Sequence, residues 1–293
     1  MAQRVPREMT YKVQMLNMKL LSNERHGDEA YKSIIKDIFR RKIKIPVYGD
    51  ANMIFKTQFE DVVNVNGLDC TILHGKISRF TLIDGNDWIN LDNMEVENID
   101  LPLNTFPNYK ESEYVFVPEA HRLAIVIKDG ISVSLVEKFL KGAIKNVINC
   151  EEDFEVCIEQ SEDVFTRITT AEKILKLQID ITYSNNDIGD DPYEFMDSQL
   201  RAGEVGRMKM DVSPNHNKNI KTDVKIIDGA LKVAQSNGYV KATIIENGKK
   251  IKVETKEHPK IIPIKCMETL LRQNIVQTVI NLFRNNHGRS RED

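Results

Sequence analysis

Four acidic residues gather near the middle of the chain, and their chemistry suits a metal ion. Asp187, Asp190, Asp191 and Glu194 lie within the stretch SNNDIGDDPYE. A hard cation such as Mg²⁺ prefers carboxylate oxygens, so these side chains are candidate metal ligands. Asn, Gly and Pro in the same stretch are also typical of a solvated linker, and acidic residues favour the first turn of a helix. Both interpretations stay open at this level.

A second candidate site interrupts the apolar segment VFVPEAHRLAIVI. Pro118 has no backbone N–H and ends or bends a strand, which places His121 and Arg122 at a corner between two apolar strands. A guanidinium at such a corner binds a phosphate or carboxylate ligand, or it pairs with a carboxylate of the protein such as Asp153 or Glu155. We predict that Arg122 is at least partly buried against a carboxylate.

His26, His121 and Arg122 are the catalytic candidates. His26 precedes a predicted helix, and an imidazole in that position is able to act as a general base. The sequence contains no phosphate-binding loop, dinucleotide fingerprint, nucleophile elbow or zincin helix. The catalytic residues are therefore unknown, and whether the protein is an enzyme, such as a nuclease, stays open.

Basic residues concentrate in the C-terminal part of the chain. Residues 201–293 contain 18 Lys and Arg against 10 Asp and Glu, whereas residues 1–200 contain 23 against 34. Such asymmetry is typical of an anion-binding part, and it is equally compatible with two parts that attract each other. We predict that phosphates of RNA or DNA are contacted by seven lysines: Lys209, Lys218, Lys221, Lys225, Lys249, Lys250 and Lys252.

The elements that position these residues follow from hydrophobic spacing. Apolar residues in 27–42 and again in 135–147 repeat at helical intervals, and Ser134 with Glu137 suggests a capping box for the second helix. Strict alternation in KILKLQIDITY predicts a half-buried strand with Lys176, Gln178 and Asp180 on its polar face. Asn-Gly pairs at 66–67 and 247–248 predict tight hairpins.

The order of predicted elements indicates an α+β fold. Strand, helix, two strands, strand, helix and strand suggest an elaborated ferredoxin-like αβ sandwich, followed by a smaller C-terminal part of helices and a β-hairpin. We predict a ferredoxin-like domain at 1–184 and a basic helix-hairpin-helix subdomain at 192–285 packed on it. The tail at 286–293 is predicted to be disordered.

Composition is that of a soluble globular protein, with 41% hydrophobic and 29% charged residues and a net charge of −3. No apolar run is long enough to span a membrane, and the first residues lack the apolar core of a signal peptide. Four scattered cysteines without zinc-ligand spacing indicate reduced thiols. We therefore expect a cytoplasmic protein that does not bind membranes.

Several segments resemble a bacterial family known only as a domain of unknown function, family 4747. The resemblance rests on IDGNDWINLDN, LPLNTFPNYKESEYVFVPEAHRLAIVI, KLQIDITYSNNDIGDDPYE and NGYVKATIIENGKKIKVETKEHP, and it covers nearly the whole chain. It implies an accessory protein of the kind found in mobile elements and phage-defence neighbourhoods. It identifies no catalytic residue.

Together these observations predict a phage-defence-associated accessory protein that binds nucleic acid through its basic C-terminal part. One alternative is a nuclease effector, either metal-dependent or based on a histidine. Another is a protein-interaction subunit that assembles with products of neighbouring defence genes or with itself. No cofactor is expected, apart from Mg²⁺ if the protein is a nuclease.

Overall fold

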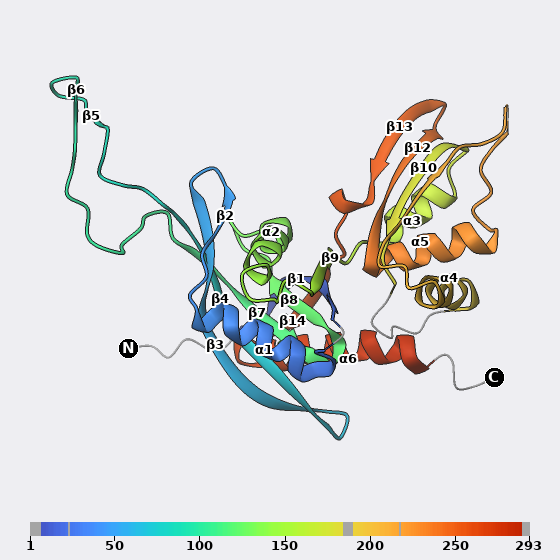
Figure 1. Cartoon of the computed structure of the whole chain (residues 1–293), viewed down its shortest axis with the longest axis horizontal. Helices are drawn as coiled ribbons and strands as arrows, with labels where there is room; N and C mark the ends of the chain where they lie inside the picture. Colours follow the sequence, from blue (N-terminus) through green and yellow to red (C-terminus); the bar gives the residue numbers. More distant parts are fainter. Residues whose placement is uncertain (1–6, 23, 184–189, 217, 289–293) are drawn as a thin grey trace.

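The computed structural model describes residues 7–22, 24–183, 190–216 and 218–288, and Figure 1 shows their arrangement. These residues form six α-helices and three antiparallel sheets. The chain is thus a mixed α/β protein built around a large, curled antiparallel sheet. Among the described helices, none is both long enough and apolar enough to cross a bilayer.

The large sheet has eight strands. Seven follow the order β14-β1-β8-β7-β4-β3-β2, and β9 pairs with the second half of β1. They are β1 (Met9–Leu21), β2 (Ile45–Tyr48), β3 (Ala51–Val65), β4 (Leu68–Thr81), β7 (Lys110–Val117), β8 (Arg122–Val126), β9 (Asp153–Ile158) and β14 (Ile262–Cys266). The predicted hairpin between β3 and β4 is confirmed: Asn66 and Gly67 have φ of 54° and 85°, as a tight two-residue turn requires.

Helices α1 (Gly27–Arg40) and α2 (Val133–Ile144) pack on one face of the large sheet. The apolar stripe of α1 is fully buried at Ile34, Ile35 and Ile38. Helix α2 begins two residues earlier than the sequence predicts: the hydroxyl of Ser132 accepts a hydrogen bond from the N–H of Leu135 at 3.4 Å. The predicted capping box at Ser134 and Glu137 is therefore wrong, because Ser134 already lies inside the helix.

Helix α6 (Leu271–Gly288) covers the opposite face of the large sheet, following the short 3-10 turn η3 (Glu268–Leu270). Strand β14 precedes it and pairs with residues 9–13 of β1. Seven consecutive residues of β1, from Val13 to Lys19, are buried, because this part of β1 pairs with β8 and β9 and has helices on both faces. Strand β14 and helix α6 thus complete the core on the α6 face of β1, although they lie far from β1 in the sequence.

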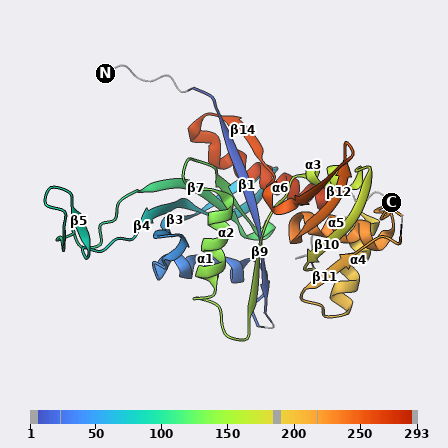
Figure 2. The same cartoon turned by 90° about the horizontal axis from the view of Figure 1, so that it is seen from above.

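The second sheet has four strands in the order β11-β10-β12-β13. They are β10 (Lys173–Ile181), β11 (Met208–Val212), β12 (Gly238–Glu246) and β13 (Lys249–Glu254), which η2 (Thr255–Glu257) follows. Helices α3 (Glu162–Thr169), α4 (Asp191–Ala202) and α5 (Lys225–Asn237) pack on one face. The predicted turn between β12 and β13 is confirmed, since Asn247 and Gly248 both have positive φ. Figure 2 shows the three helices on one side of this sheet.

The structure groups these elements differently from the expected division between residues 184 and 192. Strand β10 pairs with β11 and β12, whereas β14 and α6 return to the large sheet. We call the large sheet with α1, α2 and α6 the first unit, and residues 161–257 the second unit. Strand pairings between residues distant in sequence decide this grouping. Helix α6 extends to residue 288, and residues 289–293 of the expected tail lie outside the described residues.

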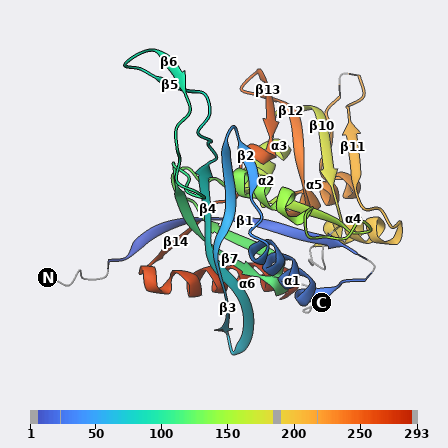
Figure 3. The same cartoon turned by 60° about the vertical axis from the view of Figure 1, so that its left-hand side comes forward.

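Residues 82–109 form an arm between β4 and β7. Two short paired strands, β5 (Trp88–Asn90) and β6 (Glu95–Glu97), form its tip. The arm stands away from both units in Figures 1 and 3.

Candidate nucleic-acid interface

Among the described residues, α3, α4 and α5 all pack on one face of the second sheet, and strand register decides which side chains the other, open face presents. Leu177, Ile179 and Val240 point to the helices, so their neighbours along each strand point the other way. One cross-strand row on this open face is Lys173, Ile245 and Lys250, and the next is Lys176, Thr243 and Lys252. These two rows contain no carboxylate.

We call Lys173, Lys176, Lys250 and Lys252 the lysine cluster. Lys176 forms an ion pair of 2.8 Å with Asp211 on β11. Within the described residues, Lys173, Lys250 and Lys252 form no ion pair. Lys250 and Lys252 are also exposed. Three ammonium groups therefore remain available to an anion at the hairpin end of the sheet.

The remaining part of the open face is closer to electrical balance. Lys241 pairs with Glu254 at 2.9 Å. Arg207 donates two hydrogen bonds to Asp180, at 2.7 and 2.8 Å. Burial opposes ionisation of Asp180 and is the largest single effect on it, but the Arg207 hydrogen bonds together with the charges of Arg207 and Lys209 lower the pKa of the carboxyl group. Lys209 lies 3.9 Å from the same carboxylate.

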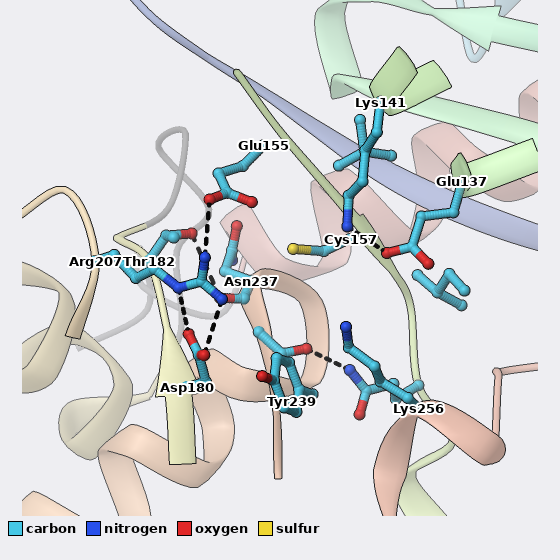
Figure 4. Close-up of a pocket in the computed structure, with 14 residues that line it drawn as sticks. Glu137, Lys141, Glu155, Cys157, Asp180, Thr182, Arg207, Asn237, Tyr239 and Lys256 are labelled. Atoms are coloured by element: carbon cyan, nitrogen blue, oxygen red, sulfur yellow. Dashed lines mark hydrogen bonds and ion pairs between the residues drawn. The ribbon is translucent and has the colours of Figure 1, made fainter. Parts of the chain in front are cut away.

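A narrow cleft lies beside the open face, between the two units, and Figure 4 shows its lining. Arg207 reaches from Asp180 towards Glu155 of β9, 3.7 Å away, and so links the units. The cavity measures about 30 Å³, which is space for about one water molecule. Burial raises the pKa of the Cys157 thiol in its wall to about 11, so this thiol is a poor nucleophile. We interpret the cleft as a junction, because it is too small for a substrate.

The structure separates the seven lysines that the sequence suggests as phosphate contacts. Lys250 and Lys252 lie in the lysine cluster, and Lys209 lies at the other end of the same face. Lys249 belongs to the helix side of the hairpin, opposite Glu246. Lys218 and Lys221 lie in the loop before α5, and Lys225 at the start of α5 pairs with Asp191 at 2.9 Å.

Two members of the cluster, Lys173 and Lys176, are not among the seven suggested lysines. The alternation of KILKLQIDITY signals Lys176, which it places on the polar face of a strand, whereas Lys173 joins the open face because the register shifts between Ile174 and Lys176. The comparison of charges in residues 1–200 and 201–293 does not detect these two lysines, because β10 lies before residue 201 and is counted with the acidic part. The second unit as a whole is not basic: residues 161–257 contain 15 Lys and Arg against 16 Asp and Glu. Its basic character is confined to one end of the open sheet face.

Arg122 occupies the predicted corner. Residues 118–120 form the 3-10 turn η1 (Pro118–Ala120), His121 has φ of 51°, and β8 begins at Arg122. The Arg122 side chain is buried and its Nε lies 2.9 Å from the Glu159 carboxylate, while its Nη1 donates to the Ala120 carbonyl at 2.7 Å. The predicted burial of Arg122 against a carboxylate is confirmed. The partner is Glu159, whereas the sequence suggested Asp153 or Glu155.

A polar cavity of about 150 Å³ adjoins this corner. Arg122 and Glu159 line it together with Lys260, which pairs with Glu162 at 3.0 Å. Both cations are thus balanced by carboxylates. The Arg122–Glu159 pair therefore joins the start of β8 to the segment that leads into the second unit at residue 161.

Both histidine candidates lie next to α1. His26 occupies the N-cap position of α1 and is exposed, without a side-chain capping bond. The ring of His121 packs against the ring of Tyr31 of α1, with centroids 4.3 Å apart and the planes tilted by 32°. The Tyr31 hydroxyl in turn accepts a hydrogen bond from the N–H of Leu20 at 2.9 Å. These contacts give His121 a structural role in joining the corner to α1.

The acidic candidates mostly serve the start of α4. Asp190 is its N-cap, accepting from the N–H of Tyr193 at 3.4 Å and pairing with Lys232. Asp191 pairs with Lys225, and Glu194 is exposed in the first turn. Asp187 lies outside the described residues. Among the side chains that the structure places, no group of three His, Cys, Asp or Glu residues is arranged to hold a metal ion.

Comparison with curated proteins finds no match to the chain. A family model does match, over residues 9–281 and thus over both units and the arm. Its description is "Domain of unknown function (DUF4747)". The match covers most of the chain, so this protein belongs to that family.

Proposed function

We propose that the protein binds the phosphate backbone of nucleic acid through the lysine cluster on the open face of its second sheet. The observation that carries the proposal is the pair of cross-strand rows with four lysines and no carboxylate. Lysine ammonium groups attract phosphates without reading base sequence. Residues two positions apart on a strand lie roughly 6.8 Å apart, so Lys250 and Lys252 are spaced to contact separate phosphates.

Aromatic side chains contribute little to this face. Tyr239 lies at the end opposite the cluster, where the ammonium group of Lys256 lies 4.1 Å from its ring centroid. Stacking on bases is thus a minor part of the proposed interaction, and affinity is expected to depend on charge. RNA and DNA are both suitable ligands on this basis.

The biological setting is part of the same proposal. The resemblance of the quoted segments supports a bacterial, cytoplasmic accessory protein associated with phage defence, with products of neighbouring defence genes as partners. The strand order β9-β1-β8-β7, with α1 after β1 and α2 between β8 and β9, supports a ferredoxin-like core for the first unit. The genes that adjoin this one in bacterial genomes test the setting.

Nucleic-acid binding is tested by fluorescence anisotropy with labelled single-stranded RNA, single-stranded DNA and duplex DNA over a range of salt concentrations. We expect affinity to fall steeply with salt and to depend little on sequence. The double variant Lys250→Glu, Lys252→Glu should bind at least about tenfold more weakly. Its slope of log affinity against log salt should be shallower by roughly 1 to 2, since each lost phosphate contact contributes about 0.7 to 0.9.

The chain offers a matched control with the same spacing and charge change. Lys42 and Lys44 are exposed and flank Ile43 in the first unit. The variant Lys42→Glu, Lys44→Glu should leave affinity and salt dependence nearly unchanged. Equal losses in the two variants would show a general effect of net charge. Absence of salt-dependent binding to every probe would refute the proposal.

A further inference from the structure

The arm carries a strong negative charge and exposes apolar side chains. Residues 82–109 contain six Asp and Glu and no Lys or Arg. Ile89 and Val96 lie opposite each other on β5 and β6, so they share one face of the tip, and they are 57% and 66% exposed. Leu91 and Met94 in the connecting turn are 75% and 69% exposed. Glu95 and Glu97 lie on the other face.

Such a tip has little to stabilise it in isolation. A two-stranded ribbon in water is marginally stable, and exposed apolar residues gathered at one place mark an interaction surface. The outer edge of β6 also leaves backbone groups available to a further strand, since β5 and β6 pair only with each other among the described residues, although the N–H of Glu95 already donates to Asn93 Oδ1 at 2.9 Å.

Strand β13 offers a complementary edge. It is the last strand in the order β11-β10-β12-β13, so one of its edges is unpaired within the described part of the chain. Lys250 and Lys252 point to the open face, and Ile251 points to the helix side, where it is partly exposed. The edge thus alternates Lys, Ile, Lys, while β6 alternates Glu, Val, Glu.

We propose that β6 of one copy of this protein adds to the β13 edge of a second copy as an antiparallel strand. With Val96 opposite Ile251, Glu95 lies opposite Lys252 and Glu97 lies opposite Lys250. The two opposite-charge pairs fall on one face, and the two apolar residues fall on the other. Backbone hydrogen bonds supply affinity and the alternating side chains set the register, as in other cases of strand addition.

Charge and geometry favour a second copy over other occupants. Two arms repel each other, because each carries six acidic residues without a cation. Figures 1 and 3 show the arm standing apart from the second sheet of the same molecule, so the tip pairs in trans. Different surfaces of the two copies meet in this contact, and a head-to-tail assembly results.

The test measures the mass of the full chain, freed of nucleic acid, by light scattering after gel filtration and by sedimentation velocity. The wild type should form dimers and larger species whose proportion grows with protein concentration. Raising salt should shift the distribution towards monomer, since the pairs lie at the surface. Two variants should each be monomeric: Glu95→Lys, Glu97→Lys on the arm and Lys250→Glu, Lys252→Glu on the edge. We expect each to weaken association roughly tenfold or more.

Mixing these two variants should restore assembly, because each then meets a partner of opposite charge. The fourfold variant that combines both changes in one chain should associate like the wild type. Glu24→Lys, Glu151→Lys is the matched control, since both residues are exposed and lie outside the arm. It should associate normally.

A wild type that stays monomeric at all concentrations in low salt would overturn the proposal, and so would an arm variant that associates normally. The proposal does not depend on nucleic-acid binding, although both involve Lys250 and Lys252. The arm variant separates them: it should lose self-association and still bind nucleic acid.

Discussion

At the residue scale, Arg122 is a structural cation. Its guanidinium is buried between β8 and Glu159, whose side chain is only 12% exposed. A buried ion pair contributes little net stability compared with apolar residues, but removal of one partner leaves the other charge without compensation. The interruption of an apolar segment by Pro, Glu, His and Arg is thus a corner whose charge is neutralised inside the protein.

We therefore predict that Arg122→Ala lowers the free energy of unfolding by about 3 kcal/mol, as measured by urea denaturation. Arg272→Ala is the matched control. Arg272 pairs with Asp61 at 3.0 Å, and both side chains are about half exposed. That substitution should cost less than about 1 kcal/mol. Unchanged stability of Arg122→Ala, together with lost nucleic-acid binding, would instead favour Arg122 as a ligand-binding residue.

At the element scale, helix α2 shows how a start signal in the sequence competes with packing. Ser132 and Ser134 are both N-cap residue types, and Glu137 is at the right spacing for a capping box with Ser134. Val133 is 2% exposed and belongs to the core between α2 and the large sheet. Burial of the Val133 side chain favours a helical backbone at position 133, so the helix begins there and Ser132 is its N-cap.

We predict that Ser132→Ala lowers stability by about 1 kcal/mol, because the N–H of Leu135 loses its partner. Ser134→Ala should change stability by no more than a few tenths of a kcal/mol, since Ala is a better helix former at an exposed position. Thermal unfolding of the two variants side by side checks the assignment. The reverse order of effects would place the cap at Ser134.

At the scale of the whole molecule, Lys19 connects the two units. It lies on β1, is 2% exposed, and its ammonium group donates a hydrogen bond to the Tyr183 carbonyl of the second unit. The same group lies 3.0 Å from the centroid of the Tyr183 ring. Burial lowers the pKa of Lys19 to about 7, while the charge of Asp197 partly opposes this shift.

This pKa predicts a pH dependence of stability. Above pH 7 the folded protein releases the Lys19 proton, whereas the unfolded chain keeps it up to about pH 10.4. The unfolded state then binds more protons, so the Lys19 contribution rises with pH by roughly 2 kcal/mol between pH 7 and 9. Lys19→Met lacks this contribution, so its stability relative to the wild type should fall over that interval.

Lys12→Met serves as the control, because Lys12 is exposed on the same strand. Its stability relative to the wild type should not vary with pH. Urea denaturation at pH 6, 7, 8 and 9 measures all three proteins. Parallel curves for Lys19→Met and the wild type would show that Lys19 stays charged in the folded protein.

Local features were decided by the sequence alone. Asn-Gly pairs predict both hairpins because their backbones reach positive φ at little cost, and Pro118 predicts the corner before β8 because it lacks an N–H. Composition and hydrophobic spacing likewise indicate a mixed α/β fold. Each of these signals acts within a few residues along the chain.

Only the tertiary structure decided which distant residues meet. Glu159 is 37 residues from Arg122, and β14 returns to β1 across almost the whole chain. The lysine cluster forms because register aligns β10 with β12 and β12 with β13, which a charge count along the chain does not detect. Strand order depends on the burial of apolar faces by helices that are distant in sequence, and many orders satisfy the same local pattern. That the acidic β6 and the basic β13 are both edge strands likewise follows only from the strand order of the folded protein.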